Sequence, residues 1–387
     1  MIESGYRGAL SGQQGGGSSM LKPKEFAEGL AHHALSRREV AATLAGAGLG
    51  MAVMPMASRH ARADPNLSIF EWSGMELPDF HPEYTARYGG EPQYTFLAEE
   101  EAALQKLRSG FTVDLSHPCT ASTRRWRDAG VIRPIDTARI ARWGDIIPEL
   151  FKPNGVLVDG VPFLMPWDFG FSQIVYNPAI IPLDNPSFDV LVDPQFERKV
   201  SMNAQFDVAL AVGGVIAGNQ NIFDPTEEET ARLVEVWRRM IKTSRFLWSD
   251  GTEITQAMAS GEVGAAYMWT SGIVELRQQG LDIRVIDPVM PWLCGLCLNA
   301  DHPGSEEQAY DYLNAVLDPA GGKALIESYY IGHANAKSYE LVDHATLVEY
   351  GLDDPAAALR RGLFFDEVPP EKRDELINLW DEVQAGG

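Results

Sequence analysis

Short apolar segments alternate with amphipathic segments along most of this 387-residue chain, and this alternation restricts the possible folds more than any other feature. The expected strands are 67–72, 111–116, 163–166, 173–176, 264–269 and 283–286. The expected helices are 99–109, 224–242, 252–260 and 305–317. Two starts carry capping signals: Asp224 precedes Pro225, and Ser305 has Gln308 three residues later. This pattern predicts an α/β protein with largely parallel sheets.

Two short segments have the composition of crossings between lobes. Residues 165–170 and 288–292 combine Pro with aromatic side chains between apolar strands. Two crossings allow one chain to build two lobes around a cleft that closes at a hinge, and the chain is long enough for a core in each lobe. The expected first lobe is 64–168 with 292–338, and the expected second lobe is 169–291 with 339–387.

The N-terminal segment 1–63 differs from the rest and has the layout of an export signal. Arg37 and Arg38 precede a mildly apolar run over 41–57, and small residues end the segment at Ala63. The run is shorter than the ~20 apolar residues that a membrane span needs. The arginine pair resembles a twin-arginine signal. We therefore expect cleavage after Ala63 and a periplasmic protein.

Cleavage at that point would make the chain strongly acidic. Without residues 1–63 it holds 25 basic and 50 acidic residues, a net charge of −25. Such a field repels nucleic acid and anionic lipid, attracts cations and favours solubility. We therefore expect no nucleic-acid partner, whereas a cationic ligand is compatible with this charge. Residues 1–19 either belong to the leader or precede a true start at Met20.

The cysteines and histidines do not form a recognisable catalytic pattern. An odd count of three cysteines in an oxidising compartment argues against a disulfide framework. Cys294 and Cys297 fall on an expected strand and should face opposite sides, so both are expected to be free thiols without metal. No metal-ligand spacing, phosphate loop or nucleophile motif is present, so we expect no enzyme, metal or cofactor. A periplasmic redox or metal enzyme using these two cysteines remains the alternative.

Several segments, in their order and spacing, carry a resemblance to a known family. They are 70–73, 105–107, 112–115, 117–120, 166–170, 248–250, 260–262 and 266–269. Together they resemble the polyamine (spermidine and putrescine) branch of the periplasmic solute-binding proteins of ABC transporters. The resemblance implies a two-lobed type II periplasmic binding fold that captures a ligand in the cleft and delivers it to a membrane permease. It also leaves open a ligand sensor for a signalling receptor. We expect a monomer.

The resemblance also implies a ligand site in which aromatic walls hold the aliphatic part and carboxylates hold ammonium groups. The expected ligand-binding residues are Trp72, Ser73, Cys119, Thr120, Asp168, Phe169, Asp207, Asp250, Trp269 and Trp292. A desolvated ammonium over an indole gains about 2 kcal/mol, and a buried ammonium needs a counter-charge.

This sequence departs from the family pattern inside the expected site. Cys294 stands where the family carries an acid, and Ala121 and Met75 stand where it carries aromatic residues. We expect Asp168, in the first crossing, to replace the missing acid. Strand alternation should turn Glu71 away from the site into solvent. Fewer acids and aromatics suit a shorter or singly cationic ligand, such as putrescine, γ-aminobutyrate or a betaine-like cation.

Overall fold

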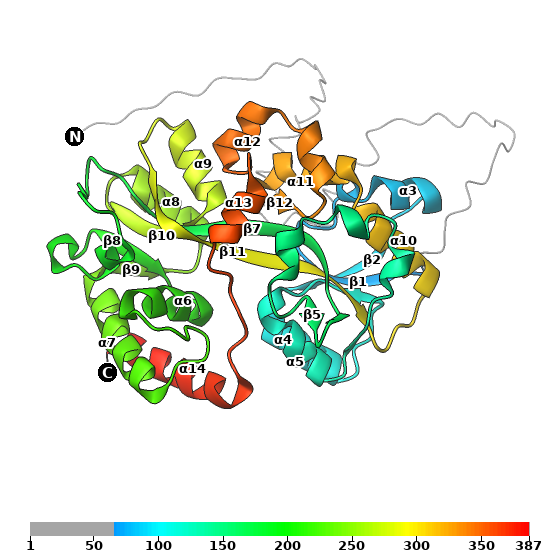
Figure 1. Cartoon of the computed structure of the whole chain (residues 1–387), viewed down its shortest axis with the longest axis horizontal. Coiled ribbons are helices and arrows are strands. Elements are labelled where there is room, and N and C mark those ends of the chain that lie inside the picture. Colours follow the sequence, from blue (N-terminus) through cyan, green and yellow to red (C-terminus); the bar gives the residue numbers. More distant parts are fainter. Residues whose placement is uncertain (1–65, 387) are drawn as a thin grey trace, which may run out of the picture. The chain divides into compact units, whose positions relative to one another are not determined.

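The computed structural model describes residues 66–386 (Figure 1). The expected leader, with its arginine pair and cleavage site, lies outside the described residues. Within the described range, none of the helices combines the length and apolar character needed to cross a membrane.

Strands and helices alternate as the sequence pattern predicts. The strands are β1 Ser68–Trp72, β2 Gln93–Leu97, β3 Leu115–Ser116, β4 Ile132–Arg133, β5 Leu157–Val158, β6 Val161–Pro162, β7 Met165–Tyr176, β8 Val200–Asn203, β9 Ser244–Trp248, β10 Ala265–Trp269, β11 Arg284–Asn299 and β12 Gly332–His333. The α-helices are α3 Pro82–Tyr88, α4 Glu100–Arg108, α5 Thr120–Asp128, α6 Phe206–Ala217, α7 Glu227–Thr243, α8 Gly251–Ala259, α9 Thr270–Gln278, α10 Glu306–Val316, α11 Pro319–Tyr329, α12 His344–Tyr350, α13 Pro355–Arg361 and α14 Pro370–Gln384. Short 3-10 helices connect several of them.

Local capping explains where several helices begin. The Thr226 hydroxyl accepts from the Glu229 amide, and the Glu229 carboxylate accepts from the Thr226 amide, which forms a capping box at α7. The Ser305 hydroxyl accepts from the Gln308 amide at the start of α10. These caps satisfy amide groups that have no partner inside the helix. Ser305 caps α10 as the sequence predicts, whereas α7 begins at Glu227 and is capped by Thr226, not by Asp224, which pairs with Lys372.

The main sheet is more mixed than expected. Its principal strand order is β2-β1-β3-β11-β7-β10-β8-β9, with β4 and β12 paired off this path. The outer pairs β1–β2, β1–β3, β8–β9 and β8–β10 are parallel. The inner pairs β3–β11, β7–β11 and β7–β10 are antiparallel. The expectation of largely parallel sheets therefore holds only away from the centre of the sheet. At the centre, β7 and β11 are antiparallel to each other and to their outer neighbours β10 and β3.

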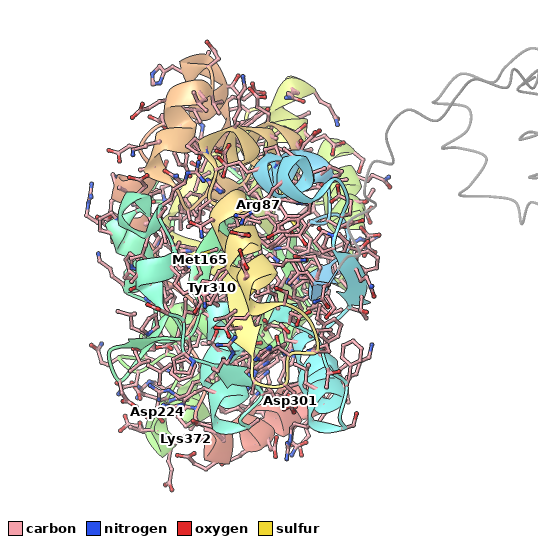
Figure 2. The ribbon with its side chains drawn as sticks, turned by 90° about the vertical axis from the view of Figure 1, so that its right-hand side faces the viewer. Arg87, Met165, Asp224, Asp301, Tyr310 and Lys372 are labelled. Carbon is pink, nitrogen blue, oxygen red and sulfur yellow. A yellow bond between two sulfur atoms is a disulfide. The ribbon has the colours of Figure 1, made fainter. Side chains whose placement is uncertain are left out.

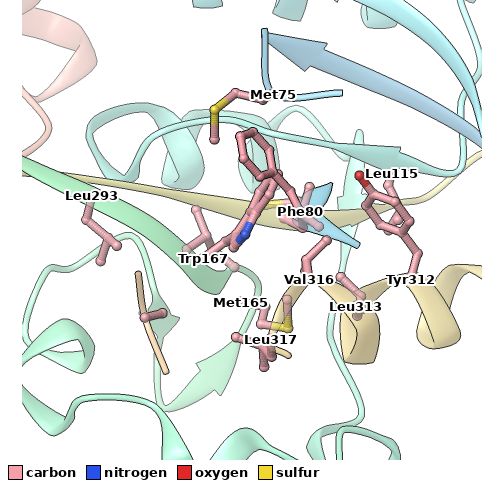
Figure 3. Packing of buried hydrophobic residues seen from close by; sticks show 14 of the residues in the cluster. Met75, Phe80, Leu115, Met165, Trp167, Leu293, Tyr312, Leu313, Val316 and Leu317 are labelled. Atoms are coloured by element: carbon pink, nitrogen blue, oxygen red, sulfur yellow. The ribbon is translucent and has the colours of Figure 1, made fainter. Parts of the chain in front are cut away.

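Two hydrophobic clusters divide the described residues, and β7 and β11 belong to both. The first cluster takes β7 residues up to Phe171 and β11 residues from Leu293; the second takes β7 residues from Ile174 and β11 residues up to Met290. Figure 3 shows Trp167 in the first cluster with Phe80 and Met165. The two long strands run between the two halves in Figure 1. The two expected crossings therefore lie on paired strands.

A third segment also passes between the clusters. Residues 362–369 connect α13, beside the first cluster, to α14, which packs on the second (Figure 1). Glu367 in this segment forms an ion pair with the Arg125 side chain of α5. The Glu367 carboxylate also accepts a hydrogen bond from the Arg125 backbone amide at 3.2 Å. At the start of α14, Lys372 forms an ion pair with Asp224 (Figure 2). This segment had no recognisable signal in the sequence.

The hydrophobic clusters also differ from the lobe bounds that we expected near the C-terminus. Val342, Leu347, Leu352 and Leu359 lie in the first cluster, although residues 339–387 were expected in the second lobe. The difference follows from the third segment, because the chain stays with the first half until about residue 361.

Candidate functional site

A cavity of about 560 Å³ is lined by residues from both clusters, both long strands and the third segment. Its lining residues are Trp72, Ser73, Met75, Cys119, Ala121, Asp168, Phe171, Ser172, Gln205, Asp207, Val208, Tyr267, Trp269, Thr270, Ser271, Trp292, Cys294, Tyr329, Ile331 and Phe365. Its volume falls in the range of small-molecule sites, and most of its wall is aromatic or aliphatic. Two carboxylates interrupt that wall.

The three tryptophans expected at the site meet in this cavity. Trp72 ends β1, Trp269 ends β10 and Trp292 lies within β11. Trp292 covers Gly170 of β7 so closely that an added Cβ would lie 2.4 Å from the indole ring. Trp269 packs edge-on against Trp248, with the ring centres 5.1 Å apart. The indoles of Trp269 and Trp292 are therefore fixed by packing while part of each faces the cavity.

Asp168 is held from behind by a buried histidine. The His117 Nε2 lies 2.7 Å from Asp168 Oδ1, and His117 Nδ1 contacts Glu71 Oε1. Trp167 packs over the imidazole, with ring centres 4.8 Å apart. Glu71 and His117 are fully buried and Asp168 is 4% exposed. The expectation that Glu71 is solvated is wrong, because both faces of β1 are covered and the carboxylate has a partner inside.

The charges of this trio depend on one another. Burial alone would lower the pKa of His117, but the Glu71 and Asp168 carboxylates outweigh it and raise that pKa to about 10. Burial raises the pKa of Glu71, against the opposing effect of His117. The protonation states of Glu71, His117 and Asp168 are therefore coupled. Of the three residues, only Asp168 lines the cavity.

Asp207 reaches the cavity from the opposite cluster. It lies in the first turn of α6, and its Oδ1 is 3.0 Å from the Arg373 Nη1 of α14. Its side chain is 44% exposed, and Arg373 also lies over the Phe206 ring, 5.4 Å from its centre. The second carboxylate of the cavity thus has a cationic partner of its own.

Comparison with known proteins gives the family. Residues 95–351 match the model of the bacterial extracellular solute-binding proteins. The chain belongs to this family. It is 23% identical to the putrescine-binding periplasmic protein PotF of Escherichia coli over 376 residues, which covers 91% of this chain and 99% of that protein. It is 22% identical to the spermidine/putrescine-binding periplasmic protein of Salmonella typhimurium, over 82% of this chain and 92% of that protein.

Solved structures agree with the fold of this solute-binding protein. The spermidine/putrescine ABC transporter substrate-binding protein PotD of Streptococcus pneumoniae superposes with a TM-score of 0.69 at 16% identity, covering 82% of this chain and 98% of that chain. The Atu4243 GABA receptor superposes with a TM-score of 0.63 at 15% identity, covering 83% and 98%. The expected two-lobed binding fold is confirmed.

Seven of the ten residues expected at the site of this solute-binding protein line the cavity. They are Trp72, Ser73, Cys119, Asp168, Asp207, Trp269 and Trp292. Thr120 does not, because it is buried in the first turn of α5 between two residues that do. Phe169 does not line it either, because it is fully buried between Phe171 and Gly332 of β12, where an added Cβ would lie 2.3 Å from the Phe169 ring.

Asp250 lies on a neighbouring cavity instead. It caps α8 by accepting from the Thr252 amide at 2.8 Å. The neighbouring cavity has a volume of about 550 Å³ and shares Trp269 and Ser271 with the first. Asp250 therefore lines the neighbouring cavity only, whereas Trp269 lines both cavities.

The expectation that Cys294 is a free thiol is wrong. It forms a disulfide with Cys119, 175 residues earlier, and does not remain a free thiol. Cys119 precedes α5 and forms an isolated bridge with Cys294 of β11, so both cysteines lie on the cavity wall. Cys297 is free and buried, and burial raises its pKa. The pair Cys294–Cys297, on which a redox enzyme would depend, is not formed.

Other lining residues had weaker or no signals in the sequence. Tyr267 lies two residues before Trp269 on the same strand face, so strand periodicity could have found it. Phe171 and Ser172 continue β7 beyond Asp168. Tyr329 and Phe365 come from α11 and the third segment, and no local pattern connects either of them to the site.

Proposed function

We propose that this solute-binding protein captures a small amine-bearing metabolite, a polyamine or an ω-amino acid such as γ-aminobutyrate, for the permease of an ABC importer. One observation carries the proposal: three indoles and two carboxylates, Asp168 and Asp207, meet in a cavity lined from both halves. Indole faces attract ammonium groups, and a buried ammonium requires a carboxylate. The relatives named for putrescine and spermidine support the same ligand class.

Of the ten residues expected from the sequence, the seven that line the cavity are proposed to form the ligand site. Trp72, Trp269 and Trp292 would contact the apolar stem and the ammonium. Asp168 would supply the counter-charge. Ser73 would offer a hydroxyl oxygen as an acceptor.

The protein would act in the periplasm after export by the twin-arginine route. The basis is the Arg37-Arg38 pair, the apolar run and the small residues before Ala63. The description of the family as extracellular supports export.

A thermal-shift screen tests the proposed ligand class. Putrescine, spermidine, γ-aminobutyrate and glycine betaine are each added to the purified protein, and at least one should raise the melting temperature. A ligand at 100 times its Kd adds about 2.7 kcal/mol to the free energy of unfolding. Butyrate is the matched control, because it has the same four-carbon chain as γ-aminobutyrate without the amine. Stabilisation by butyrate or a neutral sugar, with none by any amine, would contradict the proposal.

A further inference from the structure

The cavity wall holds two acidic residues, and each is already engaged by a cationic partner from the protein. Asp168 contacts His117, and Asp207 contacts Arg373. No Lys, Arg or His is among the residues that line this cavity. The charge offered to a ligand is therefore set by groups behind the wall.

The trio Glu71, His117 and Asp168 carries at most one net negative charge. Carboxylate oxygens only accept hydrogen bonds, so the Glu71–His117 and His117–Asp168 contacts each require a proton. Two protons shared by two carboxylates and one imidazole leave a charge of −1, wherever the protons reside. The raised pKa of His117, about 10, agrees with this count at neutral pH.

The remaining groups around the trio add no compensating charge. His333 of β12 lies opposite Asp168, and burial lowers its pKa to about 4, so it is neutral. Cys294 lies opposite Asp168 on β11 and is in the disulfide. Tyr94 and Tyr312 stay neutral because burial raises their pKa values. Behind Cys119, burial raises the pKa of Glu100 and favours its neutral form.

The second carboxylate is neutralised from the C-terminal helix. Arg373 pairs with Asp207 at 3.0 Å, and its side chain is 20% exposed. The Asp207–Arg373 pair has no net charge. The two acidic residues of the cavity wall and their partners thus carry one net negative charge, which belongs to the trio, and Asp168 is the trio member that lines the cavity.

We propose that Arg373 is a specificity-determining residue, which neutralises Asp207 and so restricts the cavity to ligands with a single cationic group, in preference to diamines and polyamines. The inference rests on the proposed function and narrows its ligand class to monoamines, ω-amino acids and betaine-like cations. The second ammonium of a diamine would lose its hydration on entering the cavity and would find no unpaired carboxylate there, which is unfavourable.

Titration calorimetry with two four-carbon probes tests the inference. Butylamine carries one ammonium and putrescine carries two. Wild-type protein should bind butylamine at least about tenfold more tightly than putrescine. Arg373→Gln frees the Asp207 carboxylate and should shift the ratio of the two affinities about tenfold toward putrescine. The double variant Arg373→Gln/Asp207→Asn removes both charges and should restore the wild-type ratio.

Lys372→Gln is the matched control. Lys372 neighbours Arg373 on α14 but pairs with Asp224, which does not line the cavity, so the ratio should stay as in wild type. If wild type prefers putrescine, or if Arg373→Gln leaves the ratio unchanged, the inference is overturned while amine capture stands. If no amine probe or screened amine binds wild type, the proposed function itself fails.

Discussion

Asp168 is the residue on which charge recognition depends in this cavity. It faces the ligand space with one oxygen engaged by His117, and the protein supplies no other net charge there. A ligand ammonium placed beside it would be desolvated by the indoles of Trp72 and Trp292. Removal of the carboxylate would therefore leave a buried charge without its partner.

Asp168→Asn should weaken binding of the ligand identified by screening by about 200- to 5,000-fold, which corresponds to a loss of about 3–5 kcal/mol. Titration calorimetry measures the change. Asp250→Asn is the control, because Asp250 lies on the neighbouring cavity and Asn also caps a helix, so its Kd should match wild type. Wild-type affinity in Asp168→Asn would place cation recognition elsewhere.

The link between α5 and β11 shows how elements far apart in the chain define the cavity wall. The Cys119–Cys294 disulfide joins the residue before α5 to a strand that belongs to both clusters. Cys294 stands where the family pattern carries an acid. The wall at this point is therefore uncharged and covalently fixed.

Replacing both cysteines by Ser should lower the free energy of unfolding by about 2–4 kcal/mol, because the disulfide restricts a long loop in the unfolded chain. Urea unfolding compares the double variant with wild type. Cys297→Ser is the control for thiol loss, since Cys297 is buried and unpaired. Peptide mapping of the unreduced protein should recover a Cys119–Cys294 pair. Recovery of a Cys294–Cys297 pair would overturn the pairing seen in the structure.

At the scale of the whole molecule, three segments pass between the two clusters: β7, β11 and residues 362–369. The third of them brings Phe365 to the cavity and leads to α14, which carries Arg373. The C-terminal helix thereby contributes to the charge of a site whose first lining residue, Trp72, lies about 300 residues earlier in the chain.

Export also concerns the whole chain. Changing Arg37 and Arg38 together to Lys should leave precursor in the cytoplasm, because the twin-arginine pathway requires that pair. Fractionation of cells followed by immunoblotting measures the distribution. A matched change of Arg59 and Arg62 to Lys, nearer the expected cleavage site, keeps the same charge and should leave export intact. Periplasmic protein from the first variant at wild-type levels would contradict the twin-arginine route but not a signal peptide of another kind.

Local signals in the sequence located many of the elements and the aromatic part of the site. Capping at Ser305 involves residues within one helical turn, so sequence spacing alone reveals it, whereas the expected cap at Asp224 lies two residues before the actual cap, Thr226. Trp72 and Trp269 end strands that the apolar pattern predicts, and the family resemblance placed them together. Those features depend on interactions over a few residues or on a shared pattern.

Only the tertiary structure decided which groups control the charge and the wall of the cavity. His117 contacts Glu71 and Asp168, which are 46 and 51 residues away in the sequence. Arg373 contacts Asp207, which is 166 residues away. Cys119 and Cys294 are 175 residues apart. Each pairing depends on strand register and on how distant elements pack, and the same side chains could equally face water if the register moved by one residue.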